Sequence, residues 1–211
     1  CLQTFVRDKC IFDVGVHYIG GLCEGQSLHQ YFKYFNIMKQ LNIQRMDLDA
    51  FDIISFDGDP KEYKLAQGHR RFVDSLSQQF PKEKKAIKTY SKMVQDICTK
   101  FPLYHLDIDK AYPDTFDHLG LNARDTIRSI SANQDLQAVL GGNSLLYGGT
   151  GDTTPFHLHA MVLNGYIQSA WRCVDGGSQI AKLLVRNIRK YGGEIYKRKE
   201  VDAFVFSGDE I

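Results

Sequence analysis

A helix enclosed by two glycine pairs constrains this chain more than any other feature of its sequence. Residues 173–193 have the sequence CVDGGSQIAKLLVRNIRKYGG. The apolar residues of this stretch recur at helical spacing on one face: Ile180, Leu184, Ile188 and Tyr191. Ser178 is a residue type that caps helix starts, and Gly192-Gly193 is typical of a helix end. We therefore expect a helix that begins with a cap at Ser178 and stops at the second glycine pair.

Apolar patterns predict the remaining elements. Alternation over 11–19 predicts a strand with one small, polar side, and AFDIISFDGD followed by EYKLAQ predicts a hairpin. Helical spacing predicts helices over 27–41, 70–80 and from Pro81 to Phe101, two helices over 122–147 divided near Asn133, and a helix from Thr154 to about Tyr166. Short strands are expected at Ile195 and over 201–205, before a Ser-Gly-Asp turn.

Composition excludes several classes of function. The 211 residues are 43% hydrophobic, and 26 basic against 25 acidic side chains leave a net charge of +1, so nucleic-acid binding is not expected. Apolar runs are too short to span a bilayer, which predicts a cytoplasmic protein and leaves peripheral membrane contact open. Five cysteines without a CxxC pair indicate reduced thiols rather than disulfides or zinc.

Several ordered stretches resemble the phytoene desaturase, carotenoid isomerase and retinol saturase group of flavin-dependent oxidoreductases, and most closely its retinol saturase and carotenoid isomerase branch. The stretches are FDVGVHYIGG (12–21), FDIISFDG (51–58), QQFPKEKKAIKTY (78–90), YGGTGDTTPFHLHAMVLNGYIQSAW (147–171), GGSQIAKLLVRNIRKYGGEI (176–195) and Val201. The likeness covers most of the chain in a single order.

The resemblance implies that FAD is the cofactor and that this chain is a central portion of the enzyme. Members of the group begin with a GxGxxG loop that holds the pyrophosphate, and they end with a second flavin segment. Neither lies within these residues, so we expect a fragment that is colourless and inactive by itself. The implied organisation is a strand and loop beside the flavin (1–25), a substrate-binding region (26–170), and a flavin-proximal helix with strands (171–211).

The resemblance also implies which residues contact the cofactor. In FDVGVHYIGG, Gly15 would let the backbone approach a flat ring, with His17 and Tyr18 beside it. The alternative is a half-buried strand with one hydrogen-bonded histidine. No catalytic acid or base is assigned.

The glycine pair before the last helix is a second expected flavin contact. Gly176 and Gly177 would leave backbone amides open to a ligand at a helix start, and the alternative is a tight turn. The group usually has proline two residues before this pair, where this chain has Val174. At Val201 the resemblance implies a main-chain contact with the cofactor.

The substrate implied by the resemblance is a hydrophobic polyene of carotenoid or retinoid type. An extended apolar molecule requires a pocket lined by apolar and aromatic side chains. Phe156 and Trp171 are the predicted lining residues, although aromatic residues of this kind also form ordinary cores.

Two further motifs suggest other sites. Gly149, Gly151 and Thr154 form a GxGxxT pattern, with Asp175 further along, that resembles a dinucleotide fingerprint but follows only a short apolar run. His157 and His159 suggest a metal pair only on an extended segment, because residues two apart on a helix point in opposite directions. We expect a helix there, and hence packing or pocket histidines without a metal.

The sequence therefore predicts a mixed α/β fold with a small mixed sheet flanked by helices, from an FAD/NAD(P)-binding-type oxidoreductase. The parent enzyme would saturate, desaturate or isomerise carbon-carbon double bonds of a polyene. Two alternatives to an enzyme remain. One is a stand-alone, non-catalytic binder of an apolar ligand, and the other is a structural module. An upstream GxGxxG would favour the enzyme.

Overall fold

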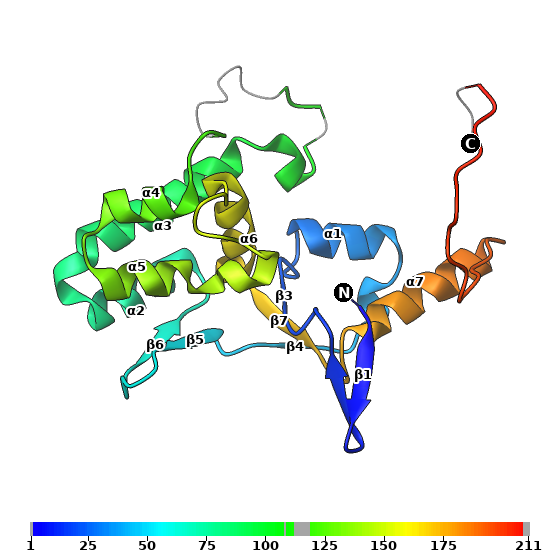
Figure 1. Cartoon of the computed structure of the whole chain (residues 1–211), viewed down its shortest axis with the longest axis horizontal. Coiled ribbons are helices and arrows are strands. Elements are labelled where there is room, and N and C mark those ends of the chain that lie inside the picture. Colours follow the sequence, from blue (N-terminus) through cyan, green and yellow to red (C-terminus); the bar gives the residue numbers. More distant parts are fainter. Residues whose placement is uncertain (1, 108, 112–118, 209–211) are drawn as a thin grey trace.

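The computed structural model describes residues 2–107, 109–111 and 119–208. Most of its helices form one layer, which occupies the left of Figure 1. The helices of this layer are α2 (His69–Gln79), α3 (Lys84–Thr99), α4 (Ala123–Ile130), α5 (Gln134–Gly141) and α6 (Phe156–Gln168). Short 3-10 turns lie between them: η2 (Pro81–Glu83), η3 (Pro102–His105) and η4 (Gly142–Tyr147). Five of the predicted helices are thus confirmed, with α6 beginning two residues later than expected.

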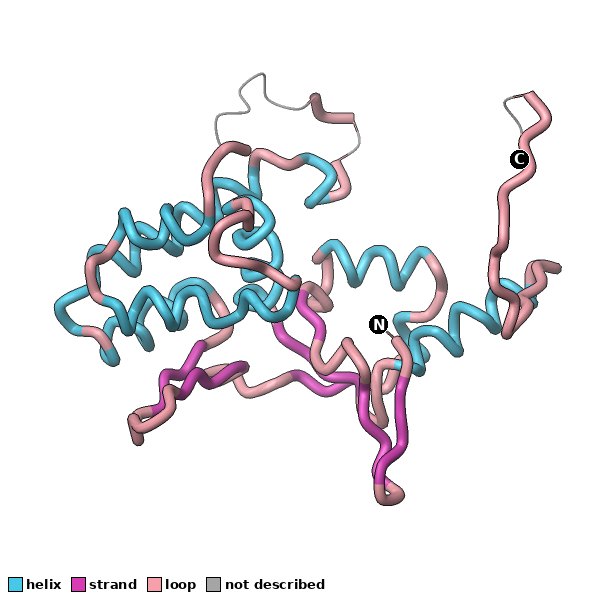
Figure 2. The backbone as a smooth tube through the Cα atoms, viewed as in Figure 1, coloured by secondary structure: helices cyan, strands magenta, loops and turns pink. Residues whose placement is uncertain are grey.

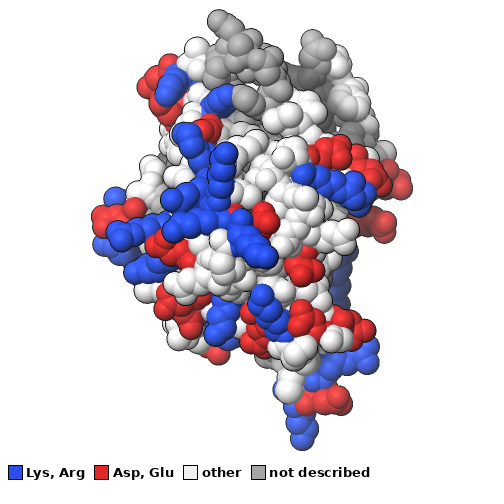
Figure 3. All heavy atoms as spheres, turned by 90° about the vertical axis from the view of Figure 1, so that its left-hand side faces the viewer, with Lys and Arg blue, Asp and Glu red and all other residues white. Residues whose placement is uncertain are grey.

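The core of this layer follows from helical periodicity. On α3 the residues Ile87, Tyr90 and Val94 recur every three to four positions, and each side chain is 0% exposed. They pack with apolar residues of α2, α4 and α6 in one continuous core. The lysines after Pro81, by contrast, are exposed, as expected for a solvated face. Figure 3 shows lysine and arginine side chains gathered on this end of the layer among acidic ones.

The strands form three small antiparallel sheets rather than the single mixed sheet predicted. The first is the hairpin of β1 (Thr4–Arg7) and β2 (Cys10–Asp13), and another is the hairpin of β5 (Asp52–Ser55) and β6 (Glu62–Leu65). Between them, β7 (Ala170–Cys173) is the central strand of a sheet with β3 (Ile19–Gly20) and β4 (Ile43–Arg45). Figure 2 shows the three sheets as separate magenta segments. The mixed α and β composition is confirmed, and the predicted 51–65 hairpin is present.

The predicted strand over 11–19 is interrupted. After Asp13 the chain leaves its ladder with β1, and pairing resumes only at Ile19, with β7 as the partner. The second half therefore belongs to a different sheet, which the alternation could not indicate. At Gly20 a Cβ would lie 2.6 Å from the carbonyl carbon of Gly165 on α6. Glycine here permits close packing of β3 against α6.

Helix α1 (Ser27–Tyr34) is shorter than the predicted helix over 27–41. Asn36 has a left-handed φ of 55°, which ends the helix, and only the 3-10 turn η1 (Met38–Gln40) follows. The N-cap of α1 is Gln26 rather than Ser27, whose hydroxyl donates to the Tyr104 carbonyl. Ile37, fully buried, continues the core beyond the break.

The glycine-bounded helix is confirmed as α7 (Ser178–Lys190), and its cap is corrected. The N-cap is Gly177, and Ser178 is the first helical residue. Gly192 has a φ of +85°, a left-handed conformation that glycine adopts without steric cost at a helix end. The strands predicted at Ile195 and over 201–205 are absent. The described tail pairs with no strand there, and Val201 and Val205 are 68% and 80% exposed.

Cysteine chemistry and hydropathy add two observations on the described residues. Cys10, Cys23, Cys98 and Cys173 are free thiols, and Cys1 lies outside the described part of the chain. Within that part, every helix is too short or too polar to cross a lipid bilayer.

Candidate functional site

The two glycine-containing stretches predicted to flank the flavin meet in the structure. The Gly177 amide donates a hydrogen bond of 3.0 Å to the Asp13 carboxylate, which lies at the end of β2. A Cβ on Gly177 would lie 3.2 Å from Val16, and one on Gly176 would lie 2.9 Å from the Asp13 oxygen. Both glycines therefore permit close contact between the turn before α7 and the segment after β2. We call this contact the glycine junction.

Asp13 occupies the helix start that the sequence suggested would be open to a ligand. Its carboxylate accepts the first free amide of α7, which suits the positive end of the helix dipole. The side chain thus acts as an N-terminal cap supplied from a distant strand. Gly176 itself has a φ of +95°, so it also serves the tight turn that was the structural alternative.

The other residues predicted to contact flavin do not all lie near the glycine junction. Gly15 and His17 lie exposed in the segment between β2 and β3, beside the glycine junction. Val201 lies in the tail beyond α7, which Figure 1 shows in red, well away from that segment. The structure therefore brings together Gly15, Gly176 and Gly177 but leaves Val201 apart.

Tyr18 turns inward, away from its exposed neighbour His17. Its hydroxyl donates to the Asp52 carboxylate at 3.0 Å, and its ring meets the edge of Tyr166 at 4.9 Å between centroids. Asn143 donates to the same Asp52 oxygen at 2.5 Å. Burial, and then the negative charge of Asp52, raise the pKa of Tyr18 well above its usual range. Tyr18 therefore remains a protonated donor that ties β3 to β5 and η4.

The two predicted substrate-lining residues lie in separate cores. Phe156 is 0% exposed at the start of α6, where it stacks on His159 at 5.8 Å between ring centroids. Trp171 on β7 is partly buried against the smaller core, and the Arg45 guanidinium lies 5.7 Å above its ring. The Trp171 indole nitrogen is buried without a hydrogen-bond partner among the described residues. The two rings therefore do not share one wall.

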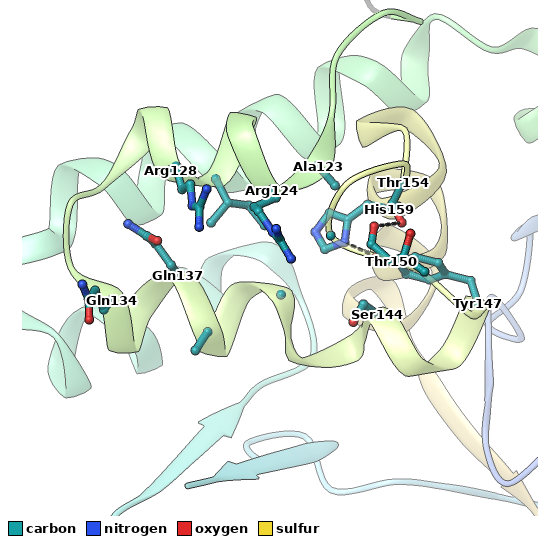
Figure 4. A pocket seen from close by; sticks show the side chains of 14 residues that line it. Ala123, Arg124, Arg128, Gln134, Gln137, Ser144, Tyr147, Thr150, Thr154 and His159 are labelled. Atoms are coloured by element: carbon teal, nitrogen blue, oxygen red, sulfur yellow. Dashed lines mark hydrogen bonds between the residues drawn. The ribbon is translucent and has the colours of Figure 1, made fainter.

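A cavity that the sequence did not predict lies between α4, α5 and α6. Its volume is about 380 Å³, within the range of small-molecule sites. Figure 4 shows Arg124 reaching into its centre, with Arg128 and Gln137 on one side and Tyr147 and His159 on the other. The apolar part of the wall is formed by Ala123, Ile127 and Ala138. We call this space the α4–α6 cavity.

A hydrogen-bonded relay forms the inner wall of this cavity. His159 Nδ1 lies 2.7 Å from the Tyr147 hydroxyl, and Nε2 lies 2.6 Å from the Tyr90 hydroxyl. Burial lowers the pKa of His159 to about 4 and raises the pKa of Tyr147 to about 12. The imidazole is therefore neutral near pH 7 and both phenols are protonated.

The GxGxxT motif contributes to this cavity and does not form a dinucleotide fingerprint. The segment before it is the 3-10 turn η4, whereas a fingerprint requires a strand there. Gly151 instead lies against the Arg124 guanidinium, with which any Cβ would clash, and Arg124 donates to Asp152 at 2.7 Å. The loop thus holds the Arg124 side chain inside the cavity.

The paired histidines of HLH lie on α6, as expected, and point to different surroundings. His157 stacks on Phe101 at 5.5 Å between centroids, while His159 faces the relay tyrosines. In the described part of the chain, no cluster of three or more potential ligands could hold a metal ion.

The sequence held little signal for the α4–α6 cavity. Arg124 and Arg128 are four residues apart on a predicted helix, which places them on one face. However, their approach to Tyr147 and His159 depends on how three helices pack. Of its lining residues, the sequence drew attention only to His159, as a packing or pocket residue, and to Gly151 and Thr154, as part of the GxGxxT pattern.

Comparison with known proteins places the chain near a class of reductases. No family model matches the sequence. Curated relatives nevertheless align with almost all of it, and each of them is a reductase.

These relatives are all-trans-retinol 13,14-reductases. The human protein is 27% identical over 96% of this chain, that of Macaca fascicularis 28% over 95%, and that of Danio rerio 25% over 98%. This confirms the resemblance to the retinol saturase group. The aligned part is 36%, 35% and 37% of the respective relative, so the chain spans little more than a third of their length.

Proposed function

We propose that this chain acts within an FAD-dependent oxidoreductase that reduces carbon-carbon double bonds of a hydrophobic, retinoid-like polyene. The observation that supports this most strongly is the alignment of almost the whole chain with all-trans-retinol 13,14-reductases. Because the relatives are reductases, saturation is the favoured direction among the three reactions implied by the sequence.

The glycine junction is the proposed flavin-facing surface. Gly15 and His17 remain exposed beside it and are the residues here that could contact a flat ring directly. Gly176 and Gly177 would act indirectly, because Asp13 and Val16 already fill the space next to them. Bound flavin would supply hydride transfer, which protein side chains cannot perform by themselves.

Trp171 is the better placed of the two proposed substrate contacts. It is partly exposed, whereas Phe156 has no exposed surface and would influence a ligand only through His159. Tyr18 lies one residue after His17 and is locked by Asp52, so its proposed contribution is to hold the segment beside the flavin rigid.

The test begins with the codons on either side of this segment. We expect an upstream GxGxxG motif, and the complete reading frame, once expressed, should purify with bound flavin. Given all-trans-retinol and a reductant, it should yield a product with one double bond fewer, measured by mass spectrometry. His17→Ala should lower flavin occupancy, while Lys39→Ala, an exposed substitution elsewhere, should not.

Several outcomes would overturn the proposal. A complete protein that lacks the motif and binds no flavin would favour the non-catalytic binder. Stoichiometric flavin on the 211-residue chain alone would contradict the view that other segments hold the pyrophosphate.

A further inference from the structure

Two segments of the chain contain basic side chains and no acidic ones. Residues 25–46 and 176–193 together hold seven of the 26 lysines and arginines and none of the 25 aspartates and glutamates. The basic residues are Lys33, Lys39, Arg45, Lys182, Arg186, Arg189 and Lys190. The rest of the chain therefore has an excess of acidic side chains. The net charge of +1 conceals this separation of charge.

The two segments lie against each other in the structure. The first includes α1 and η1, and the second is α7 with its flanking glycines, next to α1 on the right of Figure 1. The Arg186 guanidinium donates to the Gln40 side chain on η1 at 3.1 Å. The Asn187 side chain donates to the Phe35 carbonyl at the end of α1. Their positive charges therefore gather on one side of the molecule.

The basic side chains of these segments are exposed and have no acidic partner. All seven are exposed, and none of them forms an ion pair with another described residue. Lys182, Arg186 and Lys190 recur every four residues, so they form one row along α7. Arg186 joins this row to η1, which carries Lys39. We call the surface formed by these four residues the α7 basic surface.

The row on α7 favours an anionic partner. Like charges four residues apart on a helix repel each other, and the described structure supplies no carboxylate between them. A partner with several carboxylates would relieve this repulsion. Arginine in particular binds a carboxylate through two parallel hydrogen bonds.

The apolar faces of the two helices are already used in the core. Ile180 and Leu183 of α7 are 5% and 6% exposed, and Phe32 of α1 is 8% exposed. A helix that lies in a membrane interface presents such a face to the lipid. Exposed tyrosines, in contrast, are enriched at protein interfaces, and Tyr34 and Tyr191 are 84% and 77% exposed at the ends of α1 and α7. These features favour a protein partner over a bilayer.

We propose that the α7 basic surface binds an acidic protein, whose carboxylates contact Lys182, Arg186 and Lys190. The interaction goes beyond the proposed function and does not depend on it, since neither flavin nor polyene takes part. Charge complementarity would accelerate the association and make it sensitive to salt.

Titration calorimetry on the 211-residue chain tests this, with decaglutamate as the probe. We expect saturable binding at low salt. Binding should weaken at least about tenfold when the ionic strength is raised to about 0.5 M, because salt screens exposed charges. The glutamine decamer, which has the same backbone and no side-chain charge, should not bind measurably.

Two double variants locate the binding. Lys182→Gln with Lys190→Gln should weaken decaglutamate binding by about tenfold, because the row on α7 loses two of its three charges. Lys84→Gln with Lys88→Gln is the matched control, because it removes two exposed lysines from α3 and changes the net charge equally. The control should bind decaglutamate within about twofold of the unaltered chain. Circular dichroism melting verifies that both variants are folded.

The proposal is overturned if decaglutamate does not bind, or if both double variants weaken its binding equally, since the response would then be to net charge alone. Vesicles of phosphatidylcholine with phosphatidylserine, and oligothymidine, are the competing anions. If either binds more tightly than decaglutamate and loses that binding in the α7 double variant, the surface serves a membrane or a nucleic acid and the proposal is wrong.

Discussion

Apolar side chains are buried in one region of this molecule and exposed in another. In the helical body, which comprises α2 to α6 with β5 and β6, Leu76, Ile87 and Leu136 are each 0% exposed. In the outer region, which comprises β1, β2 and the tail from residue 194 to residue 208, Ile11 is 71% exposed and Val205 80%. Figure 1 shows this outer region on the right, extending away from the body.

The difference shows what a hydrophobic pattern requires in order to become structure. Helices of the body bury their apolar faces against each other, and that burial stabilises them. The tail has an alternating pattern as clear as that of β5, yet it forms no strand, because a strand needs a partner to satisfy its backbone groups.

The largest expected effect compares the same substitution in both regions. Ile87→Ala should lower the free energy of unfolding by about 2 to 5 kcal/mol, because it opens a cavity in a fully buried site. Ile11→Ala should change it by no more than about 0.5 kcal/mol. Urea denaturation measures both values, and similar losses would contradict the comparison.

Acid sensitivity should come from the body through His159. The pKa of its imidazole is about 4 in the folded chain against 6.5 as the ordinary value, so the unfolded state takes up the proton first as the pH falls. The free energy of unfolding therefore keeps this contribution in full above pH 6.5 and loses it as the pH falls towards 4. The loss is on the order of 3 kcal/mol.

Urea denaturation at several pH values, on the wild type and on His159→Gln, isolates that contribution. The variant should lose this part of the decline below pH 6.5, whereas His17→Gln, in the exposed segment between β2 and β3, should retain it. An unchanged pH dependence in His159→Gln would refute the assignment.

Close backbone packing should distinguish two glycines in contact. Gly20→Ala should destabilise the chain by about 1 to 3 kcal/mol, because its Cβ would meet the backbone of Gly165 at 2.6 Å. Gly165→Ala has open space for its Cβ in the middle of α6 and should be neutral or stabilising by about 0.5 to 1 kcal/mol. Thermal unfolding compares the two variants, and Gly165→Ala should be the more stable. If Gly20→Ala were the more stable, the close packing of β3 against α6 at Gly20 would be wrong.

The smallest effect should come from the glycine junction. Asp13→Ala removes the carboxylate that caps α7 and should cost about 1 kcal/mol. Hydrogen exchange should show faster opening confined to the first turn of α7. Asp57→Ala, in the exposed turn after β5, is the control, and equal exchange at α7 in both variants would argue against the cap.

Sequence patterns predicted the helices well and the sheets poorly. The helices α2, α3, α4, α5 and α7 follow from spacing and from caps such as Asn122 and Asn133, both of which accept a hydrogen bond from the helix they begin. The central strand β7 escaped prediction, and the strand over 11–19 was divided between two sheets. Helix signals are local, whereas strand pairing depends on distant segments.

The site shows the same division. Motif resemblance placed Gly15 near Gly176 and Gly177, and the structure brings them together. It could not reveal that Asp13 fills the helix start, because the contact spans 164 positions of sequence. The relay of His159 with two tyrosines has no sequence spacing of its own.

By itself the sequence determined where most helices lie and which group of enzymes the chain resembles, since both depend on neighbouring residues and their order. Only the tertiary structure decided which strands pair, which way Tyr18 turns, and that a cavity opens beside His159. Those features arise from contacts between segments far apart in the chain, and such contacts exist only once the helices have packed.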